Sequence, residues 1–557
     1  MYWSYEYVNQ KYPVETKDAW TIKEAVEATA VYGDRVYLID AVKGNKYTYG
    51  QSNIIANKIA NSLINIGLRK YETIGIYMTN KPETIFTLFA VGKAGVVEVP
   101  INSNLRVPEI THMVNNAQIS TIVVDSNKDF LHTLSKVAEA TSVLKKVIVL
   151  GDMSIVPQMN AEVFSFDEMI KNGADSNPQI QVSASDNYVI FFTSGTTGLP
   201  KGAPISNKTF ILAAKSVSAV PVITKDSRNY TCLPLFHANA QLYSMTTMRL
   251  LGATLILSDR FSTKKFWKEI TENGATYFNS IGGMMQILDA AFKPEDVPDH
   301  TAKAVFVGGT PADLWERFEK KFRVSVFEGY SMSEVPVLFG NFHPDKNKRK
   351  TGSFGKPIFP DLDRKTRVVD DENKELRVGT GELVQMGGTD FCTKSYLNAP
   401  EADKEVFDSE GWFHSGDLVR KDEDGYHYFV DRKKFMIRVA GENVSAFEVE
   451  DVVNAYPAIA QSAVVPVPDA LREEEIKAFV KLKEGVEKID YTDFIKFCAT
   501  RLAHFKVPRY VEIVDDFPKT ATERIKKVEM KNNEKQRKDH GWDRNKEIPD
   551  WKGKFVV

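Results

Sequence analysis

The first half of the chain alternates short apolar runs with segments of helical length. Thr73–Met78 predicts a buried strand, and Pro82–Lys93, with proline in its first turn, predicts a helix. The same rhythm continues through the next segments, which are Val96–Pro100, Val107–Asn116, Thr121–Val124 and Lys146–Leu150. It resumes in four later apolar runs, Tyr188–Thr193, Ala253–Leu257, Ala304–Val307 and Val324–Phe327. Such alternation is typical of α/β layers with largely parallel sheets.

The pattern changes after about residue 360. The glycines at 379, 381, 387 and 388, together with the aromatic run Tyr426–Val430, predict short antiparallel strands joined by glycine turns. Beyond this stretch, Phe447–Ala455 and Asp493–Leu502 predict the helices of a small α+β unit.

The last part of the chain, from about residue 524, is basic and poor in apolar residues, which predicts a solvated helix and extension. We therefore expect an α/β protein with two domains. Residues 1–433 would form a large N-terminal domain of layered α/β sheets with a small β-rich subdomain. Residues 434–557 would form a small, mobile α+β C-terminal domain.

Composition narrows the possible partners. The 557 residues include 72 Lys and Arg against 74 Asp and Glu, a formal charge of −2, which argues against a nucleic-acid or membrane-surface binder. No apolar run reaches the length of a spanning helix, and the start lacks a signal-peptide pattern. Cys232, Cys392 and Cys498 lie far apart, which favours a reducing compartment. We expect a cytoplasmic protein.

The densest chemical signal is the string TSGTTGLPKG, residues 193–202, which follows an apolar strand. It holds four hydroxyl residues and three glycines, so its backbone N–H groups can approach an oxyanion closely, and Lys201 can add a positive charge. Ser206 can cap a helix over Phe210–Val217. Lys201 precedes a glycine rather than Ser or Thr, so the string is not a P-loop of the Ras or ATPase type.

The string resembles the signature loop of the adenylate-forming superfamily of acyl-CoA synthetases, luciferases and peptide-synthetase adenylation domains. Further resemblances follow in the family's order: GYSMSE at 329–334 is similar to GYGxTE, and WFHSGD at 412–417 to WFHTGD. DRKK at 431–434 with GEN at 441–443 resembles the domain hinge, and PKTAT at 518–522 the run before the C-terminal lysine. PLFHANAQ at 234–241 and GWDR at 541–544 look most like the carnitine/crotonobetaine-CoA-ligase branch.

The resemblance implies an ATP-dependent, AMP-forming acid–CoA ligase. A small carboxylic acid attacks the α-phosphate of ATP, and the acyl-adenylate then passes to coenzyme A. The implied cofactors are ATP, Mg²⁺ and coenzyme A, and the protein is expected as a monomer or homodimer. Two alternatives stay open: an acyl-AMP ligase that loads a carrier protein, and a catalytically impaired nucleotide-binding homologue.

The resemblance also implies the nucleotide site. Its residues are expected to be Thr193, Ser194, Gly195, Thr196, Thr197, Gly198, Lys201, Gly308, Gly309, Thr310, Glu328, Gly329, Tyr330, Ser331, Ser333, Asp417 and Arg432. Glu334 and Thr196 are the expected magnesium ligands, because Mg²⁺ prefers carboxylate and phosphate oxygens. Tyr330 is expected to stack on adenine, and Asp417 to accept the ribose hydroxyls with Arg432 beside it.

The acyl pocket is expected at His237, Asn239, Gln241, Gly282 and Gly308. His237 would border the acyl carboxylate. A quaternary-ammonium substrate calls for an aromatic cage, for which Tyr243 and Phe278 are candidates, whereas a short or medium aliphatic acid calls for none.

The C-terminal region is expected to supply the moving parts of the reaction. Lys434 matches the hinge, and Gly441 would approach the pantetheine channel of coenzyme A. The family reads PKTxxGK near its C-terminus, whereas this chain has Glu523 and Arg524 in place of Gly and Lys. Arg524 keeps the charge but not the shape of lysine, so it is the first candidate for the catalytic cation and Lys527 the second.

Overall fold

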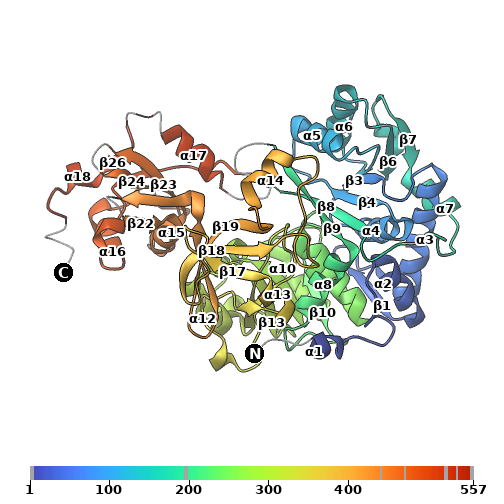
Figure 1. Cartoon of the computed structure of the whole chain (residues 1–557), viewed down its shortest axis with the longest axis horizontal. Coiled ribbons are helices and arrows are strands. Elements are labelled where there is room, and N and C mark those ends of the chain that lie inside the picture. The colour runs from blue at the N-terminus through green and yellow to red at the C-terminus, as the bar shows by residue number, and fades with distance from the viewer. Residues whose placement is uncertain are drawn as a thin grey trace. The chain divides into compact units, whose positions relative to one another are not determined.

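The structure is a computed structural model that describes residues 5–193, 199–439, 442–469, 472–519, 525–534, 537 and 539–551. The chain divides into two compact units (Figure 1). The first unit comprises residues 1–367, 384–413 and 424–427, and the second residues 368–383, 414–423 and 428–557. The predicted boundary after residue 433 and the mobility of the C-terminal domain stay predictions.

Two large sheets organise the first unit. Sheet A has the strand order β16 (Lys356–Pro357), β15 (Phe339–Asn341), β14 (Ser325–Tyr330), β13 (Ala304–Gly308), β12 (Tyr277–Ile281), β10 (Arg228–Thr231), β11 (Thr254–Leu257), β1 (Val36–Asp40) and β2 (Lys46–Thr48). Sheet B has the order β7 (Glu162–Ser165), β6 (Lys146–Leu150), β5 (Thr121–Asp125), β3 (Thr73–Tyr77), β4 (Val97–Pro100), β8 (Asn187–Thr193) and β9 (Lys201–Ser206). In sheet A, the pairs β10–β11, β10–β12, β12–β13 and β13–β14 are parallel. In sheet B, the pairs β3–β4, β3–β5, β4–β8 and β5–β6 are parallel.

Helices cover both faces of sheet B (Figure 1). Helices α5 (Val107–Asn116) and α6 (Lys128–Ala140) bury their apolar faces on β4, β5 and β6 in one hydrophobic cluster. Helices α3 (Tyr49–Asn65) and α4 (Pro82–Ala94) lie on the opposite face. This sandwich explains why most strands of sheet B are rich in apolar residues, since parallel strands covered on both faces meet little water.

The remaining helices of the first unit connect the strands. They are α1 (Tyr5–Asn9), α2 (Ile22–Ala28), α7 (Phe166–Asn172), α8 (Asn207–Val217), α9 (Thr247–Leu251), α10 (Thr263–Glu272), α11 (Gly282–Ala291), α12 (Ala312–Phe322), α13 (Pro360–Arg364) and α14 (Pro400–Val406). Ser206 caps α8 as predicted, because its hydroxyl accepts the N–H of Thr209. A π-helix, η3 (Asn239–Thr246), precedes α9; such helices often mark functional segments.

Sheet C has the strand order β17 (Thr366–Val369), β18 (Gly379–Met386), β19 (Trp412–Lys421) and β20 (His427–Arg432), and its residues are shared between the units. Sheet D belongs to the second unit, in the order β22 (Glu442–Ser445), β21 (Met436–Val439), β24 (Glu473–Leu482), β25 (Tyr510–Ile513) and β26 (Trp542–Asp543), with β23 (Ile459–Asp469) also paired to β24. The helices of this unit are α15 (Ala446–Asn454), α16 (Tyr491–Ala499), α17 (Lys527–Glu534) and α18 (Arg544–Glu547). The predicted α/β fold class is confirmed.

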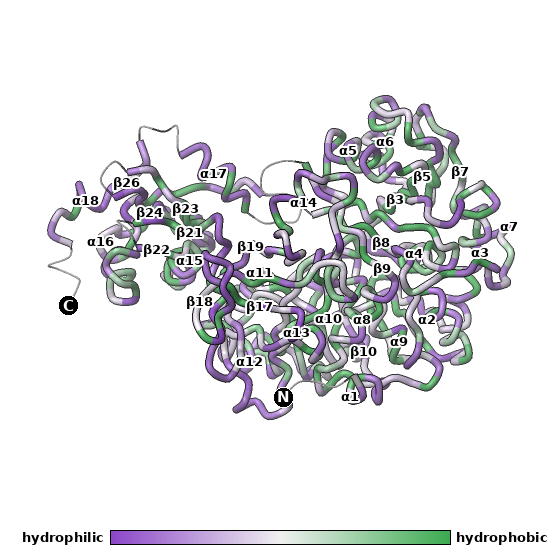
Figure 2. The backbone as a smooth tube through the Cα atoms, in the orientation of Figure 1, coloured by the Kyte–Doolittle hydropathy of each residue, from purple (hydrophilic) through white to green (hydrophobic). Residues whose placement is uncertain are grey.

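The prediction of a solvated C-terminal extension is wrong. Figure 2 draws α17 and α18 largely in the hydrophilic colour, yet Ile548 and Trp551 belong to the hydrophobic core of sheet D. Met530 on α17 is buried in a second cluster. The guanidinium of Arg544 is buried 3.9 Å from the centre of the Trp551 ring. A few well-spaced apolar residues therefore anchor this segment, although its average composition is polar.

Two further observations concern the cysteines and the helices of the described part of the chain. Cys232, Cys392 and Cys498 are all buried and none forms a disulfide. Among the described helices, none combines the length and apolar character that a membrane crossing requires.

Candidate active site

The flanks of the predicted phosphate loop form a β-hairpin. Strands β8 and β9 pair antiparallel, with Thr193 opposite Lys201. Ser194, Gly195, Thr196, Thr197 and Gly198 lie outside the described residues, so their predicted roles stay predictions. The hairpin nevertheless fixes both ends of the loop, because Thr193 closes one strand and Lys201 opens the next.

Glu334 lies beside this hairpin, four residues after β14. Its side chain is only 5 % exposed, and its Oε1 atom accepts hydrogen bonds from Tyr396 Oη at 2.7 Å and Thr193 Oγ1 at 3.3 Å. The backbone N–H of Thr393 donates to the carbonyl of Glu334 at 2.8 Å. Among the residues that the structure describes, no donor binds Oε2, so one carboxylate oxygen remains available to a ligand.

Tyr396 links Glu334 to Lys201, and no sequence motif marks it. Its ring lies 5.7 Å from the Lys201 ammonium, and its hydroxyl donates to Glu334. Burial and the neighbouring Glu334 carboxylate raise the pKa of Tyr396, which keeps its hydroxyl protonated as a donor. The residue comes from the segment before α14, some 60 positions from Glu334, and only the tertiary structure brings the two together.

Lys201 itself pairs with Glu405 at 3.0 Å, and the Glu405 side chain is 64 % exposed. An exposed ion pair of this kind contributes about 0–1 kcal/mol. A phosphate group can therefore replace Glu405 as the partner of Lys201 at small cost.

Glu328 ties together the ends of β13 and β14. Its buried carboxylate accepts the N–H of Gly309 at 2.7 Å, the N–H of Thr310 at 3.1 Å and the Thr310 hydroxyl. Burial raises the pKa of Glu328 to about 7, although these hydrogen bonds oppose the shift. Gly309 has φ +79°, and a Cβ on Gly282 would lie 1.9 Å from the Gly309 carbonyl oxygen. Both positions therefore require glycine, because a side chain would clash or force strained backbone.

The segment after Glu328 holds the predicted adenine-binding tyrosine. The Tyr330 ring stacks on Phe354 with centroids 4.5 Å apart. The Ser331 hydroxyl donates to the Tyr243 hydroxyl oxygen at 2.9 Å, because the single Tyr243 proton goes to the Pro336 carbonyl. Gly329 is the register partner of Gly340 on β15, and Ser333 is half-buried. The segment is thus held by aromatic packing, with its hydroxyl side chains near the surface.

Of the predicted acyl-pocket residues, His237, Asn239 and Gln241 lie on or before η3, whereas Gly282 begins α11 and Gly308 ends β13. His237 is half-buried, with its ring edge-on to Phe236 at 4.7 Å. Asn239 accepts a hydrogen bond from Asn279 at 2.9 Å. Gln241 is fully buried and donates to Glu98 Oε1 at 2.6 Å. Gly308, the last residue of β13, stands in register with Ile281, directly before Gly282.

Tyr243 and Phe278, the candidates for an aromatic cage, are both packed in the hydrophobic core. Tyr243 is buried and packs edge-on against Phe306, and its hydroxyl is hydrogen-bonded. Phe278 is fully buried against Phe266 and Trp267. The two rings come from different packing clusters, so together they do not form a cage for a quaternary ammonium group.

In the second unit, Asp417 and Arg432 form an ion pair. Arg432 Nε lies 2.5 Å from Asp417 Oδ1, and the Asp417 side chain is buried. The Ser415 hydroxyl accepts the N–H of Asp417 at 3.0 Å, which fixes the turn between them. Lys434, the predicted hinge, lies in the single turn η6 (Lys433–Phe435) immediately after β20 and is exposed. Gly441 lies outside the described residues.

The described residues on either side of the predicted C-terminal cation are joined by backbone hydrogen bonds. Lys519 and Ile525 form an antiparallel bridge, and the N–H of Lys526 donates to the carbonyl of Pro518 at 2.8 Å. Arg524 lies outside the described residues. Lys527, the second candidate, pairs at 2.5 Å with Glu450, which is buried on α15.

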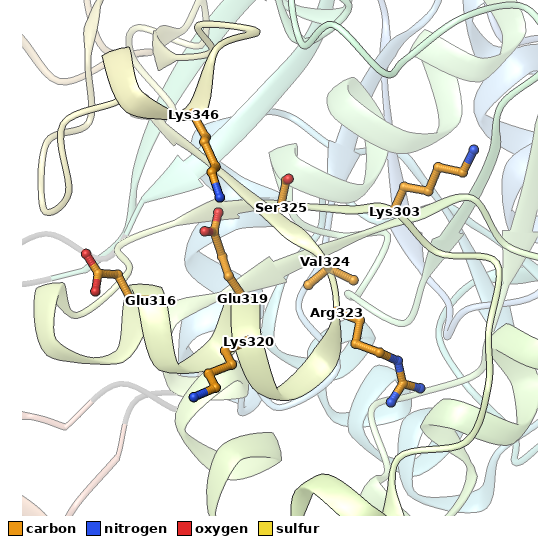
Figure 3. Close-up of a pocket in the computed structure, with 8 residues that line it drawn as sticks. All are labelled: Lys303, Glu316, Glu319, Lys320, Arg323, Val324, Ser325 and Lys346. Carbon is orange, nitrogen blue, oxygen red and sulfur yellow. The ribbon is translucent and has the colours of Figure 1, made fainter.

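One surface depression lies away from all these residues. Figure 3 shows it lined by charged side chains, among them Lys303, Lys320, Arg323 and Lys346. Lys303 precedes β13 and Ser325 begins β14, so the depression is at the amino ends of two parallel strands. Glu328 lies near the carboxyl end of β14 and Glu334 follows it, at the edge where open α/β sheets bind their ligands.

Comparison with known proteins decides the family. The profile of AMP-binding enzymes matches residues 25–397, and that of the AMP-binding enzyme C-terminal domain matches residues 448–524. The chain belongs to the AMP-binding enzyme family. A crotonobetaine/carnitine–CoA ligase of Salmonella paratyphi B is 32 % identical over 515 residues, covering 91 % of this chain and 97 % of that protein. The same ligase of Salmonella choleraesuis is also 32 % identical, over 518 residues.

Solved structures of this family share the fold. An anthranilate CoA ligase in complex with anthranoyl-AMP superposes with a TM-score of 0.82 at 23 % identity, covering 95 % of this chain and 99 % of that one. An o-succinylbenzoate CoA synthetase from Bacillus subtilis in complex with its acyl-adenylate gives a TM-score of 0.78 at 23 % identity, covering 93 % and 99 %. The predicted family is confirmed, and with it the predicted activity as an AMP-forming acid–CoA ligase that works through an acyl-adenylate.

Proposed function

We propose that this AMP-binding enzyme activates a small carboxylic acid with ATP and Mg²⁺ and transfers the acyl group to coenzyme A, and that Glu334 is the residue on which adenylation depends. One observation carries the proposal. The Glu334 carboxylate is almost completely buried and held at Oε1 by Tyr396, while Oε2 has no donor among the described residues. A carboxylate oxygen kept free in this way is an acceptor for a cation.

The donor set fits Mg²⁺ that arrives with the nucleotide. No group of three or more His, Cys, Asp or Glu side chains able to hold a metal occurs within the described ranges. Mg²⁺ commonly binds one or two carboxylates together with substrate phosphates, so Glu334 with ATP is a sufficient set and a dedicated cage is not required. When bound, the ion would neutralise the charge that develops on the phosphates.

The side chains around Glu334 then have separate tasks. Lys201 exchanges its exposed partner Glu405 for a phosphate oxygen and adds a positive charge there. Glu328 holds the turn at Gly309 and Thr310, and so shapes the end of β13. Tyr330, supported on one face by Phe354, offers a ring on which adenine can stack.

Asp417 and Arg432 supply the ribose contacts in this proposal. The ion pair holds the Asp417 carboxylate in place, and an ionised carboxylate can accept both ribose hydroxyls. Lys434 serves as the hinge between the two half-reactions, and Gly441 approaches the pantetheine arm of coenzyme A. Arg524 is the preferred C-terminal cation, since Lys527 is already engaged with a buried carboxylate.

The experiment is AMP release from ATP, Mg²⁺ and coenzyme A across a panel of carboxylic acids. Crotonobetaine and carnitine enter first because the relatives carry those names, followed by short, medium, long-chain and aromatic acids. Turnover that needs both an acid and coenzyme A supports the proposal. AMP release without any need for coenzyme A would contradict the ligase activity and favour carrier loading. ATP binding without pyrophosphate exchange would contradict adenylation altogether.

A further inference from the structure

A buried carboxyl group lies directly beneath the segment that carries His237. Glu98 is on β4, an inner strand of sheet B, where its register partner on β8 is Val189, and its side chain is fully buried. The amide of Gln241, on η3, donates from Nε2 to Glu98 Oε1 at 2.6 Å. A glutamate in a position this deep needs a reason, because an ionised carboxylate without a cation is costly to bury.

The orientation of the Gln241 amide is fixed by a second contact. The same Nε2 atom donates to the carbonyl oxygen of Leu235 at 2.8 Å, and a backbone carbonyl can only accept. Both N–H groups of the amide are therefore used, and Oε1 is an acceptor. No partner binds Gln241 Oε1 or Glu98 Oε2 within the described part of the chain, although both atoms are buried. The pair thus leaves one unsatisfied oxygen on each side.

We propose that Glu98 is a neutral carboxylic acid at pH 7 and that its Oε2–H donates to Gln241 Oε1, closing a two-hydrogen-bond acid–amide pair that positions the His237 segment. A proton on Oε2 satisfies both unpartnered oxygens at once. An ionised Glu98 satisfies neither and leaves both buried oxygens without a donor.

The surroundings of Glu98 support the neutral form. Among the described residues no charged side chain acts on it, and burial raises its pKa to about 8, with the Gln241 hydrogen bond opposing the shift. The titratable group facing it from β8 is Tyr188, whose hydroxyl donates to the Leu88 carbonyl and whose pKa burial raises far above its usual value. Neither β3 nor η3 contributes a counter-charge.

The pair controls the loop that contains His237. The N–H of Leu235 donates to Asn80 Oδ1 at 2.8 Å, and its carbonyl accepts from Gln241. The N–H of His237 donates to the Pro234 carbonyl at 3.0 Å, closing a tight turn between these anchors. Loss of the Glu98 proton would weaken the Gln241 anchor and release the turn. Glu98 and Gln241 are therefore positioning residues that act through His237.

Two substitutions at Glu98 test the proposal. Glu98→Gln replaces the acid with an amide, which can form both hydrogen bonds with Gln241 at any pH. Glu98→Leu fills the space and can form neither. The activity readout rests on the proposed function, so kcat and KM for the acid are measured by CoA-dependent AMP release between pH 6 and pH 9.5.

The expected result is a difference in pH profile. Wild-type kcat/KM falls above pH about 8, the pKa of Glu98, by about tenfold per pH unit. Glu98→Gln keeps its activity across this range relative to wild type at pH 7, and Glu98→Leu loses at least tenfold at every pH, mainly in KM for the acid. If Glu98→Gln shows the same alkaline fall as wild type, or is no better than Glu98→Leu, the positioning role is wrong.

A measurement without substrate separates this proposal from the proposed function. The infrared difference spectrum between wild type and Glu98→Gln should show a protonated carboxyl C=O band at pH 6 that disappears above pH about 8. Absence of that band at pH 6 overturns the neutral-acid assignment whatever the activity. A wild-type protein that shows the band but turns over no acid supports the pair and contradicts the proposed function alone.

Discussion

Three buried glutamates of the first unit and two of the second are held in opposite ways. In the first unit, Glu98, Glu328 and Glu334 receive their hydrogen bonds from neutral donors: an amide, backbone N–H groups and hydroxyls. In the second unit, Glu450 and Glu534 contact cationic side chains. Neutral donors stabilise a carboxylate without cancelling its charge, whereas a cation cancels it.

The two arrangements suit different tasks: binding a ligand's cation and holding elements of the fold together. Glu334, which follows the end of β14, keeps one carboxylate oxygen without a donor among the described residues and can meet a cation that arrives with a ligand. In the second unit, Lys477 is completely buried between Glu512 and Glu534, and Glu534 also contacts His540 at 2.7 Å. Such a closed network holds α17 on sheet D and leaves no charge for a ligand.

The largest effect is expected from removing the free carboxylate charge at Glu334. Glu334→Gln keeps the shape and one acceptor oxygen but cannot neutralise a cation. We expect adenylation, measured as ATP–pyrophosphate exchange, to fall by about 10³-fold, the upper range for loss of one electrostatic contact. Glu401→Gln, which breaks an exposed pair with Lys404, is the matched control and should retain full exchange. Comparable losses in both variants would contradict the role of Glu334.

The next effect distinguishes the two candidate C-terminal cations. Arg524→Ala should slow adenylation by about 10²-fold with little change in stability, if Arg524 contacts the nucleotide. Lys527→Met should instead destabilise the second unit by about 3 kcal/mol, because it leaves Glu450 buried without its cation.

A double variant sharpens this test. Adding Glu450→Gln to Lys527→Met should restore most of the stability measured by denaturant unfolding, since no unpaired charge then remains. If Lys527→Met stops pyrophosphate exchange while the protein stays as stable as wild type, Lys527 is the catalytic cation and the preference for Arg524 is wrong.

Tyr396→Phe probes the neutral donor itself. Loss of the hydroxyl removes a hydrogen bond to a charged acceptor, worth about 1.5–3 kcal/mol. We expect a roughly tenfold decrease in exchange rate and weaker binding of ATP in the presence of Mg²⁺, measured by calorimetry with and without the ion. Tyr188→Phe removes a buried hydroxyl that binds only a backbone carbonyl, so its ion dependence should match wild type. Equal ion dependence in all three proteins would rule out Tyr396 as a positioning residue.

The smallest expected effect is on local stability, which should depend on pH in opposite directions around Glu328 and around Glu534. The pKa of Glu328 is raised to about 7 by burial, so its contribution to stability is present below pH about 4.5 and is lost as pH rises to about 7. Burial also acts on Glu534, but His540 and Lys477 lower its pKa overall, so its contribution is present above pH about 4.5 and is lost in acid. Each effect is about 1.4 kcal/mol per pH unit at most.

Hydrogen exchange, corrected for intrinsic rates, can measure both trends in one sample. Peptides from β14 should lose protection between pH 5 and pH 7.5, and peptides from α17 should lose it between pH 5 and pH 3.5. Parallel trends in the two segments would show that the contrast between neutral and cationic partners does not govern their stability.

The sequence by itself determined the architecture of the first unit. Each apolar run of the first half became a strand within one or two residues of its predicted bounds, as Lys146–Leu150 and Thr73–Tyr77 illustrate. These strands lie in parallel sheets with helices on both faces, so most of their residues must be apolar, and an apolar run is visible in sequence. The phosphate loop and its partner motifs were visible for a related reason, because their chemistry requires particular residue types in a contiguous string.

Tertiary structure decided everything that depends on partners far apart in the chain. No local pattern marks Tyr396 as the donor to Glu334, or Glu98 as the partner of Gln241. The C-terminal segment was mispredicted because charge averages hide Ile548 and Trp551, whose burial depends on the sheet that they meet. Local spacing fixes which face of a strand or helix is apolar, but the partner of a polar side chain is set by the fold, because hydrogen bonds act only at contact distance.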